Sequence, residues 1–135
     1  MKTRLFKNLG RVAVLLAAAS LAQHVVAGEV IAHASVELGA AEVRDVFVGD
    51  KVLAGGTKLV PVDNAAAQAE FLSKVVQVDA VKYTALWTKK SFREGLTAPA
   101  SKGGDAEVIA FVKSTPGAIG YVSGHSAGVK VISKY

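Results

Sequence analysis

The chain has 135 residues, no cysteine and a formal net charge of +5. The absence of cysteine excludes a disulfide scaffold, a thiol nucleophile and a cysteine-based zinc site. Four of the 16 Lys and Arg residues, and none of the 11 Asp and Glu residues, lie within residues 1–11, so most of the net charge belongs to that segment.

The first 27 residues have the pattern of a secretory signal peptide. The basic segment 1–11 precedes an apolar run over 12–22, which is too short to span a bilayer, since spanning takes about 20 residues. Small residues then offer cleavage after Ala22 or, as we favour, after Ala27. The alternative, an uncleaved amphipathic anchor, is disfavoured because no amphipathic pattern follows. We therefore expect an exported, periplasmic protein without stable membrane insertion.

Residues 28–135 keep 12 basic and 11 acidic residues, a net charge near +1. A nucleic-acid-binding domain would carry a basic surface, so the sequence predicts no nucleic-acid partner. The basic patch that remains, Lys89, Lys90 and Arg93 beside Phe92, is interpreted as a solvated helix end. A segment of this length can bury one hydrophobic core, which predicts one domain.

The first expected elements are a strand and a helix. Residues 29–34 (EVIAHA) form a short apolar run that is typical of a strand buried on at least one face. Residues 39–42 (GAAE) open a helix that ends near Gly49. One face of this helix carries Val43, Val46 and Phe47.

Gly55 and Gly56 indicate a turn, and residues 58–62 (KLVPV) predict a second strand. Pro61 favours an edge or an end of that strand, because proline has no backbone N–H to donate.

Two helices are expected next. Asp63 or Asn64 caps a helix over 65–76, and Asp79 starts another. The inward faces are predicted to be Ala67, Phe71, Leu72 and Val75 in the first helix, and Val81, Ala85, Leu86 and Trp87 in the second.

The last third of the chain continues the alternation. Residues 101–104 (SKGG) indicate a loop, and Asp105 is expected to cap the helix that follows. This helix packs through Val108, Ile109, Phe111 and Val112. Strands are predicted over 118–122 and 129–132. Strands that alternate with helices predict an α/β domain with a mixed or mainly parallel sheet flanked by helices.

Residues 124–128 (GHSAG) match the Gly-x-Ser-x-Gly nucleophile elbow of hydrolases. In that elbow a helix follows the serine at once, and the acid and the histidine come later in the chain. Here a strand pattern follows, and no Asp, Glu or His lies beyond Ser126. We interpret the segment as an exposed turn between two strands and predict no catalytic activity.

Residues 115–122 (TPGAIGYV) have a different interpretation. Pro116 ends the preceding helix and Gly117 allows a left-handed turn into the strand. Gly120 lies within the strand, where a missing side chain indicates that a helix or a ligand approaches closely. A helix packed across Gly120 is the preferred interpretation.

Metal and cofactor sites are not expected. His24 leaves with the predicted leader, and His33 and His125 have no neighbouring acid or histidine at ligand spacing.

Five segments together resemble the substrate-binding protein family of the phosphate ABC transporter. They are AEVRDVFVGDK (41–51), KLVPVD (58–63), Phe71, Trp87 and FVKSTPGAIGYV (111–122). The resemblance runs from the first strand to Ile132. It implies a three-layer-like α/β fold equivalent to one lobe of a two-lobed periplasmic binding protein that holds phosphate between its lobes.

The chain departs from the family where phosphate is bound. The family's Arg, Asp and Ser-Gly-Thr residues correspond to residues 62–68 (VDNAAAQ), which lack the arginine and the hydroxyls. An ionised Asp63 would also repel an anion. What remains is a helix start with unpaired amides on Ala65 and Ala66, which attracts an oxyanion weakly. The candidate ligand-binding residues are Asn64, Ala65, Ala66, Gln68, Ser35 and Tyr121.

The resemblance implies that the protein binds phosphate or another small oxyanion, or delivers it to an ABC transporter permease. Because a single lobe leaves the site open, a second copy or another protein would close it. The alternative is an interaction module that kept the lobe fold, lost the ligand and contacts a partner or itself.

Overall fold

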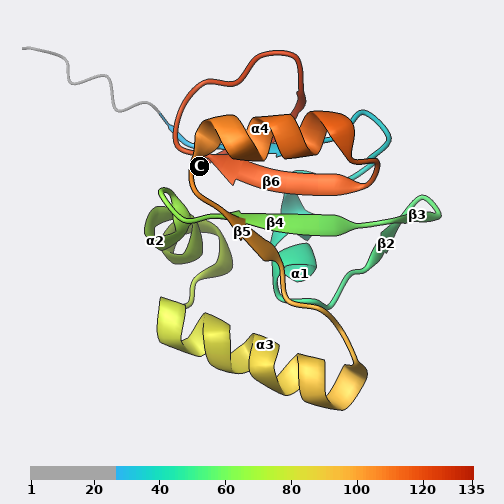
Figure 1. Ribbon diagram of the computed structural model, residues 1–135, viewed down its shortest axis with the longest axis vertical. Coiled ribbons are helices and arrows are strands. Elements are labelled where there is room, and N and C mark those ends of the chain that lie inside the picture. The colour runs from blue at the N-terminus through green and yellow to red at the C-terminus, as the bar shows by residue number, and fades with distance from the viewer. Residues whose placement is uncertain (1–26) are drawn as a thin grey trace, which may run out of the picture.

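The computed structural model describes residues 27–135, so the predicted signal peptide lies outside the described residues except for Ala27. Strands and helices alternate along the chain (Figure 1). The elements are β1 (Glu29–Ala32), the 3-10 helix η1 (Ala40–Glu42), α1 (Val43–Phe47), β2 (Leu53–Ala54), β3 (Thr57–Lys58), β4 (Val60–Asn64), α2 (Gln68–Phe71), the π-helix η2 (Leu72–Val76), α3 (Ala80–Glu94), β5 (Ala100–Lys102), α4 (Asp105–Ser114), β6 (Ala118–Val122) and β7 (Lys130–Lys134).

The main sheet has five strands in the order β5-β4-β6-β1-β7. β4 pairs in parallel with β5 and β6, whereas β1 pairs antiparallel with β6 and β7. The predicted α/β class with a mixed sheet is therefore confirmed. β2 and β3 form a separate hairpin, and its turn is Gly55–Gly56, where both residues have positive φ.

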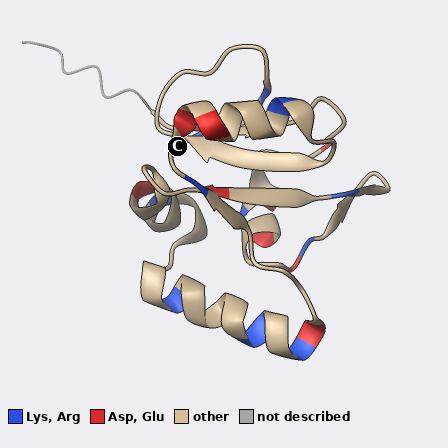
Figure 2. Cartoon of the chain, in the orientation of Figure 1, with Lys and Arg blue, Asp and Glu red and all other residues tan. Residues whose placement is uncertain are grey.

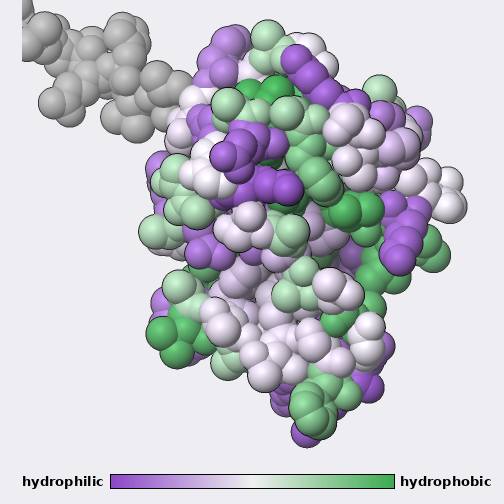
Figure 3. Space-filling model, viewed as in Figure 1, coloured by the Kyte–Doolittle hydropathy of each residue, from purple (hydrophilic) through white to green (hydrophobic). Residues whose placement is uncertain are grey.

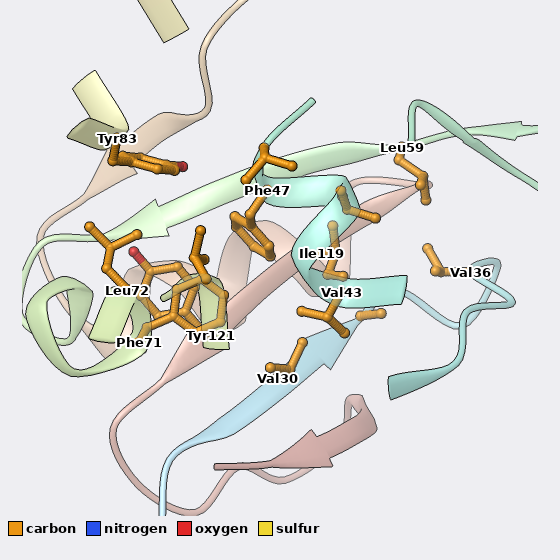
Figure 4. Packing of buried hydrophobic residues seen from close by; sticks show 14 of the residues in the cluster. Val30, Val36, Val43, Phe47, Leu59, Phe71, Leu72, Tyr83, Ile119 and Tyr121 are labelled. Atoms are coloured by element: carbon orange, nitrogen blue, oxygen red, sulfur yellow. The ribbon is translucent and has the colours of Figure 1, made fainter. Parts of the chain in front are cut away.

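Successive residues of the strands point to opposite faces of the sheet, and each face is covered by helix. Ile119 and Tyr121 of β6 belong to the larger core cluster, together with Phe47 of α1 and Phe71 of α2 (Figure 4). Ala118 and Val122 belong to a second cluster formed with α4. The sheet thus lies between two helical layers, as the three-layer-like prediction requires.

Gly120 is the place where α4 crosses β6 most closely. A Cβ at this position would lie 2.7 Å from Val108 Cγ1 and 2.9 Å from Val62 Cγ1. The preferred interpretation, a helix packed across the glycine, is confirmed.

α3 lies at one end of the molecule, beyond α1 and α2 (Figure 1). It begins after Asp79, whose side chain accepts a hydrogen bond from the Lys82 amide, and it buries Tyr83 and Trp87. The prediction that Val81 and Ala85 face inward was wrong, because both are exposed. Tyr83 and Trp87 are one turn apart and bury much more apolar area, so they set the rotation of the helix.

Several boundaries also differ from the predictions. Ser101 and Lys102, expected within the loop over 101–104, belong to β5, which is stabilised by its pairing with Val62–Asn64. The helix expected over 65–76 begins as a turn and becomes helical only at Gln68. Pro61 is the second residue of an inner strand, and it is tolerated because pairing with β5 begins only at Val62.

Candidate functional site at the carboxyl end of strand β4

The parallel strands β4, β5 and β6 end at the same edge of the sheet, which is where open α/β sheets bind ligands. Polar side chains from four segments meet at this edge. They are Asp63 and Asn64 of β4, Lys102 of β5, Asp105 of α4 and Ser123 after β6.

The buried side chain of Asn64 makes hydrogen bonds to three segments at this edge. Its Nδ2 donates to Asp105 Oδ1 at 2.7 Å and to the carbonyl of Tyr121 at 3.1 Å. Its Oδ1 accepts a hydrogen bond from the Ala66 amide at 3.1 Å. The side chain thereby links the ends of β4 and β6 to α4.

The expectation of unpaired amides on Ala65 and Ala66 was wrong. The Ala65 amide donates to the carbonyl of Lys102 at 2.8 Å, and the Ala66 amide is the one that donates to Asn64. Residues 65–67 form a turn that continues the sheet hydrogen bonding, so these two amides are already satisfied without an anion.

Asp105 does not cap α4 through its side chain, contrary to the prediction. Its carboxylate instead accepts hydrogen bonds from the amide and hydroxyl of Ser123 and from Asn64. Partial burial raises the pKa of Asp105, but the hydrogen bonds from Ser123 and Asn64 outweigh it and hold that pKa below its usual range. Asp105 therefore places a negative charge in contact with Asn64, which opposes an anion at that position.

Asp63 is more buried than Asp105, with 4% of the residue exposed. Tyr83 Oη donates to its carboxylate at 3.0 Å, and Tyr121 Oη donates to Oδ1 at 2.9 Å. Burial raises the pKa of Asp63, and the tyrosine hydrogen bonds lower it only in part. Burial and the neighbouring Asp63 also raise the pKa of both tyrosines, which keeps them protonated as donors.

A surface pocket of about 480 Å³ opens over Asp63 between α2, α3 and the segment that leads to β5. Its other lining residues are Gln68, Tyr83, Thr84, Trp87, Thr88, Ser91, Phe92, Ala98 and Pro99. Asp63 is the only charged residue in this set, which belongs entirely to the described residues. Aromatic rings and hydroxyl groups thus surround a single carboxylate.

The structure brings five of the six candidate ligand-binding residues to this edge, but not Ser35. Ser35 Oγ accepts a hydrogen bond from the Gly117 amide at 3.0 Å. Gly117 precedes β6, so Ser35 lies at the opposite end of the sheet from Asn64. Tyr121 lies in the core beneath this edge. Its side chain is buried, and its hydroxyl donates to Asp63.

Comparison with protein-family models and with curated proteins returned no match. The resemblance to phosphate-binding proteins therefore stays a prediction. In the described residues, no three His, Cys, Asp or Glu side chains are grouped so that they could hold a metal ion. None of the helices described is long and apolar enough to cross a membrane.

The GHSAG segment forms a loop from β6 to β7, as predicted, but its serine is not exposed. Ser126 is 9% exposed, and its hydroxyl donates to Glu29 Oε2 at 2.9 Å. His125 Nδ1 lies 2.9 Å from Glu29 Oε1. The serine therefore contacts a carboxylate instead of a histidine, and the acid beside His125 comes from the first strand.

Ser126→Ala is expected to lower the free energy of unfolding by about 1 to 3 kcal/mol, because the buried Glu29 loses a hydrogen-bond donor. Burial raises the pKa of Glu29, but the hydrogen bonds from Ser126 and His125 outweigh it, so that pKa is lowered. Because the pKa of Glu29 is lower in the folded state than in the unfolded state, where it is about 4.3, Glu29 stabilises the fold at pH values above about 4.3. This stabilisation is lost as the pH falls through the pKa of the folded state. Ser126→Ala should therefore cost less at pH 3 than at pH 7, as urea denaturation can measure.

The matched control is Ser123→Ala, which removes a hydroxyl from an exposed residue of the same loop. It should cost less than Ser126→Ala at pH 7, because Asp105 keeps the Ser123 amide and Asn64 as donors. Equal costs for the two variants would contradict the burial-based explanation.

Proposed function

We propose that the protein is an exported solute-binding domain whose ligand is a small organic cation held over Asp63. The observation that carries the proposal is the position of Asp63, a buried carboxylate that lines a pocket and has no cationic partner. Within residues 27–135, the ion pairs involve Glu29, Glu42, Asp50, Glu70 and Glu94, but not Asp63. An ammonium group in the pocket would supply the missing countercharge.

A carboxylate that is removed from water without a counterion is destabilised, which is why the pKa of Asp63 is raised. The two tyrosine hydroxyls offset part of this cost. Trp87 and Phe92 line the same pocket, and aromatic rings attract organic cations. Gln68, Thr84 and Thr88 add groups that can accept hydrogen bonds from an ammonium N–H.

This proposal replaces the expected oxyanion by a cation for two reasons. The amides of Ala65 and Ala66 are paired within the chain. Asp63 and Asp105, the acids nearest to them, would both oppose an anion. The fold class is that of the predicted lobe, so a role in solute binding is retained while the charge of the ligand changes.

The test is the melting temperature of the protein with 1,4-diaminobutane or choline at millimolar concentration, against sodium chloride of equal ionic strength. A ligand at ten times its dissociation constant stabilises the fold by about 1.4 kcal/mol. For a domain of this size, that corresponds to a rise of several degrees. We expect the rise with wild type and not with Asp63→Asn.

Asp45→Asn is the matched control, since Asp45 is an exposed acid of α1 outside the pocket, and its response to the amines should equal that of wild type. Inorganic phosphate is the probe for the oxyanion hypothesis. If phosphate raises the melting temperature and neither amine does so, the oxyanion hypothesis is correct instead. Amine binding that persists in Asp63→Asn would also refute the proposed site.

Asp63→Asn should fold, because one amide oxygen can accept from both tyrosines. The raised pKa of Asp63 stabilises the fold fully below its unfolded pKa of about 3.9, and this contribution is lost as pH rises through the folded pKa. The variant should therefore be at least as stable as wild type at pH 7. Its melting temperature without ligand checks this and distinguishes a loss of binding from unfolding.

A further inference from the structure

The outward side of α3 combines exposed apolar residues with unpaired cations. We call it the α3 outer face and define it as Val81, Lys82, Ala85, Lys89, Phe92 and Arg93. Phe92 is 94% exposed and Val81 is 78% exposed. The apolar residues are at positions 81, 85 and 92, and the cations are at positions 82, 89 and 93. Both sets follow the spacing of one helix face, so they form two adjacent stripes along the helix.

The charge of the protein is concentrated on this helix. α3 carries four basic residues and one acidic residue, whereas residues 28–135 as a whole are near +1. Figure 2 shows the basic residues spread along α3. Lys90 pairs with Asp50 and Glu94, but Lys82, Lys89 and Arg93 form no ion pair within the described residues.

The shape of the α3 outer face is that of a projecting ridge. α3 lies at the end of the molecule (Figure 1), and the part of its surface seen in Figure 3 is mostly of intermediate hydropathy, with hydrophobic residues at its edges. Val81 and Phe92 are eleven residues apart, which is about 16 Å along a helix axis. Lys82 and Arg93 span the same length. The cations of this face border an open hollow of about 630 Å³, which is lined by Lys82, Ala85, Leu86, Lys89, Lys90, Arg93 and Glu94.

We propose that the α3 outer face docks on an anionic lipid surface, with α3 parallel to the membrane plane. Apolar side chains flanked by Lys and Arg are the features by which helices lie in the headgroup region. The cations would contact lipid phosphates, while Val81 and Phe92 enter the acyl boundary. A planar array of anionic headgroups can contact cations that are spread over about 16 Å of a straight helix.

The α3 outer face and the pocket over Asp63 share one residue, Phe92. The remaining residues differ, so Asp63→Asn tests the ligand site and a variant of the cations tests the α3 outer face. Thr84, Thr88 and Ser91 line the pocket over Asp63, whereas Lys82, Lys89 and Arg93 lie on another side of α3. Docking would place the pocket beside the membrane surface.

The experiment is co-sedimentation of the processed protein with vesicles of phosphatidylcholine alone or with 30% phosphatidylglycerol, at 50 and 300 mM sodium chloride. Each Lys or Arg near an anionic surface contributes roughly fivefold to binding, so three cations contribute about a hundredfold. We expect about a hundredfold preference for the anionic vesicles at low salt. This preference should shrink at high salt because the charges are screened.

The decisive variant is Lys82→Gln, Lys89→Gln, Arg93→Gln, which should lose most of the preference. Its matched control, Lys58→Gln, Lys113→Gln, Lys134→Gln, removes the same charge from exposed positions elsewhere and should keep the preference. Phe92→Ala should weaken binding without altering the salt dependence. All variants are expressed, processed and purified in the same way as wild type, so that they differ only at the substituted residues.

Three outcomes would overturn the proposal. Wild type that does not bind anionic vesicles at 50 mM salt has no membrane-docking face. Equal losses in the two triple variants would mean that net charge, not the α3 outer face, drives binding. Equal binding of Phe92→Ala and wild type to anionic vesicles would mean that the exposed ring of this face does not enter the acyl boundary.

Discussion

Trp87→Ala is expected to lower the free energy of unfolding by about 3 to 5 kcal/mol. Trp87 is 5% exposed, and its Nε1 donates to the carbonyl of Phe47 at 3.0 Å. The ring also packs against Gly49. Because Tyr83 and Trp87 are the two buried side chains of α3, the variant removes one of the two main apolar anchors that hold this helix to the body.

The measurement is urea denaturation followed by circular dichroism, because the variant removes the single tryptophan and with it the usual fluorescence signal. Phe92→Ala removes a ring from the same helix at an exposed position and should change stability by no more than about 0.5 kcal/mol. Trp87→Phe keeps an apolar ring but leaves the Phe47 carbonyl unpaired, so its cost should fall between the other two. An unchanged midpoint in Trp87→Ala would mean that the ring contributes nothing to the core.

Gly117→Ala should cost about 2 to 5 kcal/mol, the second large effect. Gly117 has a φ of +81°, a region that costs an L-residue about 1 to 2 kcal/mol. A Cβ there would also lie 2.1 Å from the carbonyl oxygen of Lys58. The overlap would push β6 away from the start of β4, where the Val60 amide donates to the Gly117 carbonyl, and overpacking of this kind costs about 1 to 3 kcal/mol more.

Gly56→Ala separates the two contributions. Gly56 has the same φ of +81°, but a Cβ there would meet nothing within 4 Å. It should therefore show only the conformational cost, of about 1 to 2 kcal/mol. Thermal or urea denaturation of both variants measures the difference. If Gly117→Ala is no more destabilising than Gly56→Ala, the close approach to Lys58 is not a constraint on the fold.

Functional residues at the edge of β4 were only partly predictable. Asn64 and Gln68 were identified through the resemblance, and Asp63 was recognised as a charge that opposes anions. Tyr83 was missed, although its position one turn before Trp87 was a signal that it shares the buried face. The Glu29 partner of Ser126 and His125 carried no signal, because 97 residues separate Glu29 from Ser126.

The sequence by itself determined the elements whose sequence signals are local. β6 has the predicted bounds of 118–122, and α1 buries the predicted Val43, Val46 and Phe47. The left-handed Gly117 that follows α4 was likewise predicted. These features depend on apolar periodicity and on the backbone freedom of glycine within a few residues.

Only the tertiary structure decided the features whose partners are distant in sequence. β5 exists because β4 lies beside it, and the Ala65 amide is satisfied by Lys102. The rotation of α3 depends on the Phe47 carbonyl, 40 residues from Trp87, and this rotation exposes Val81 and Phe92. Local periodicity identifies the apolar positions of a helix but not the surface against which they pack. The side of α3 that faces solvent therefore depends on tertiary packing.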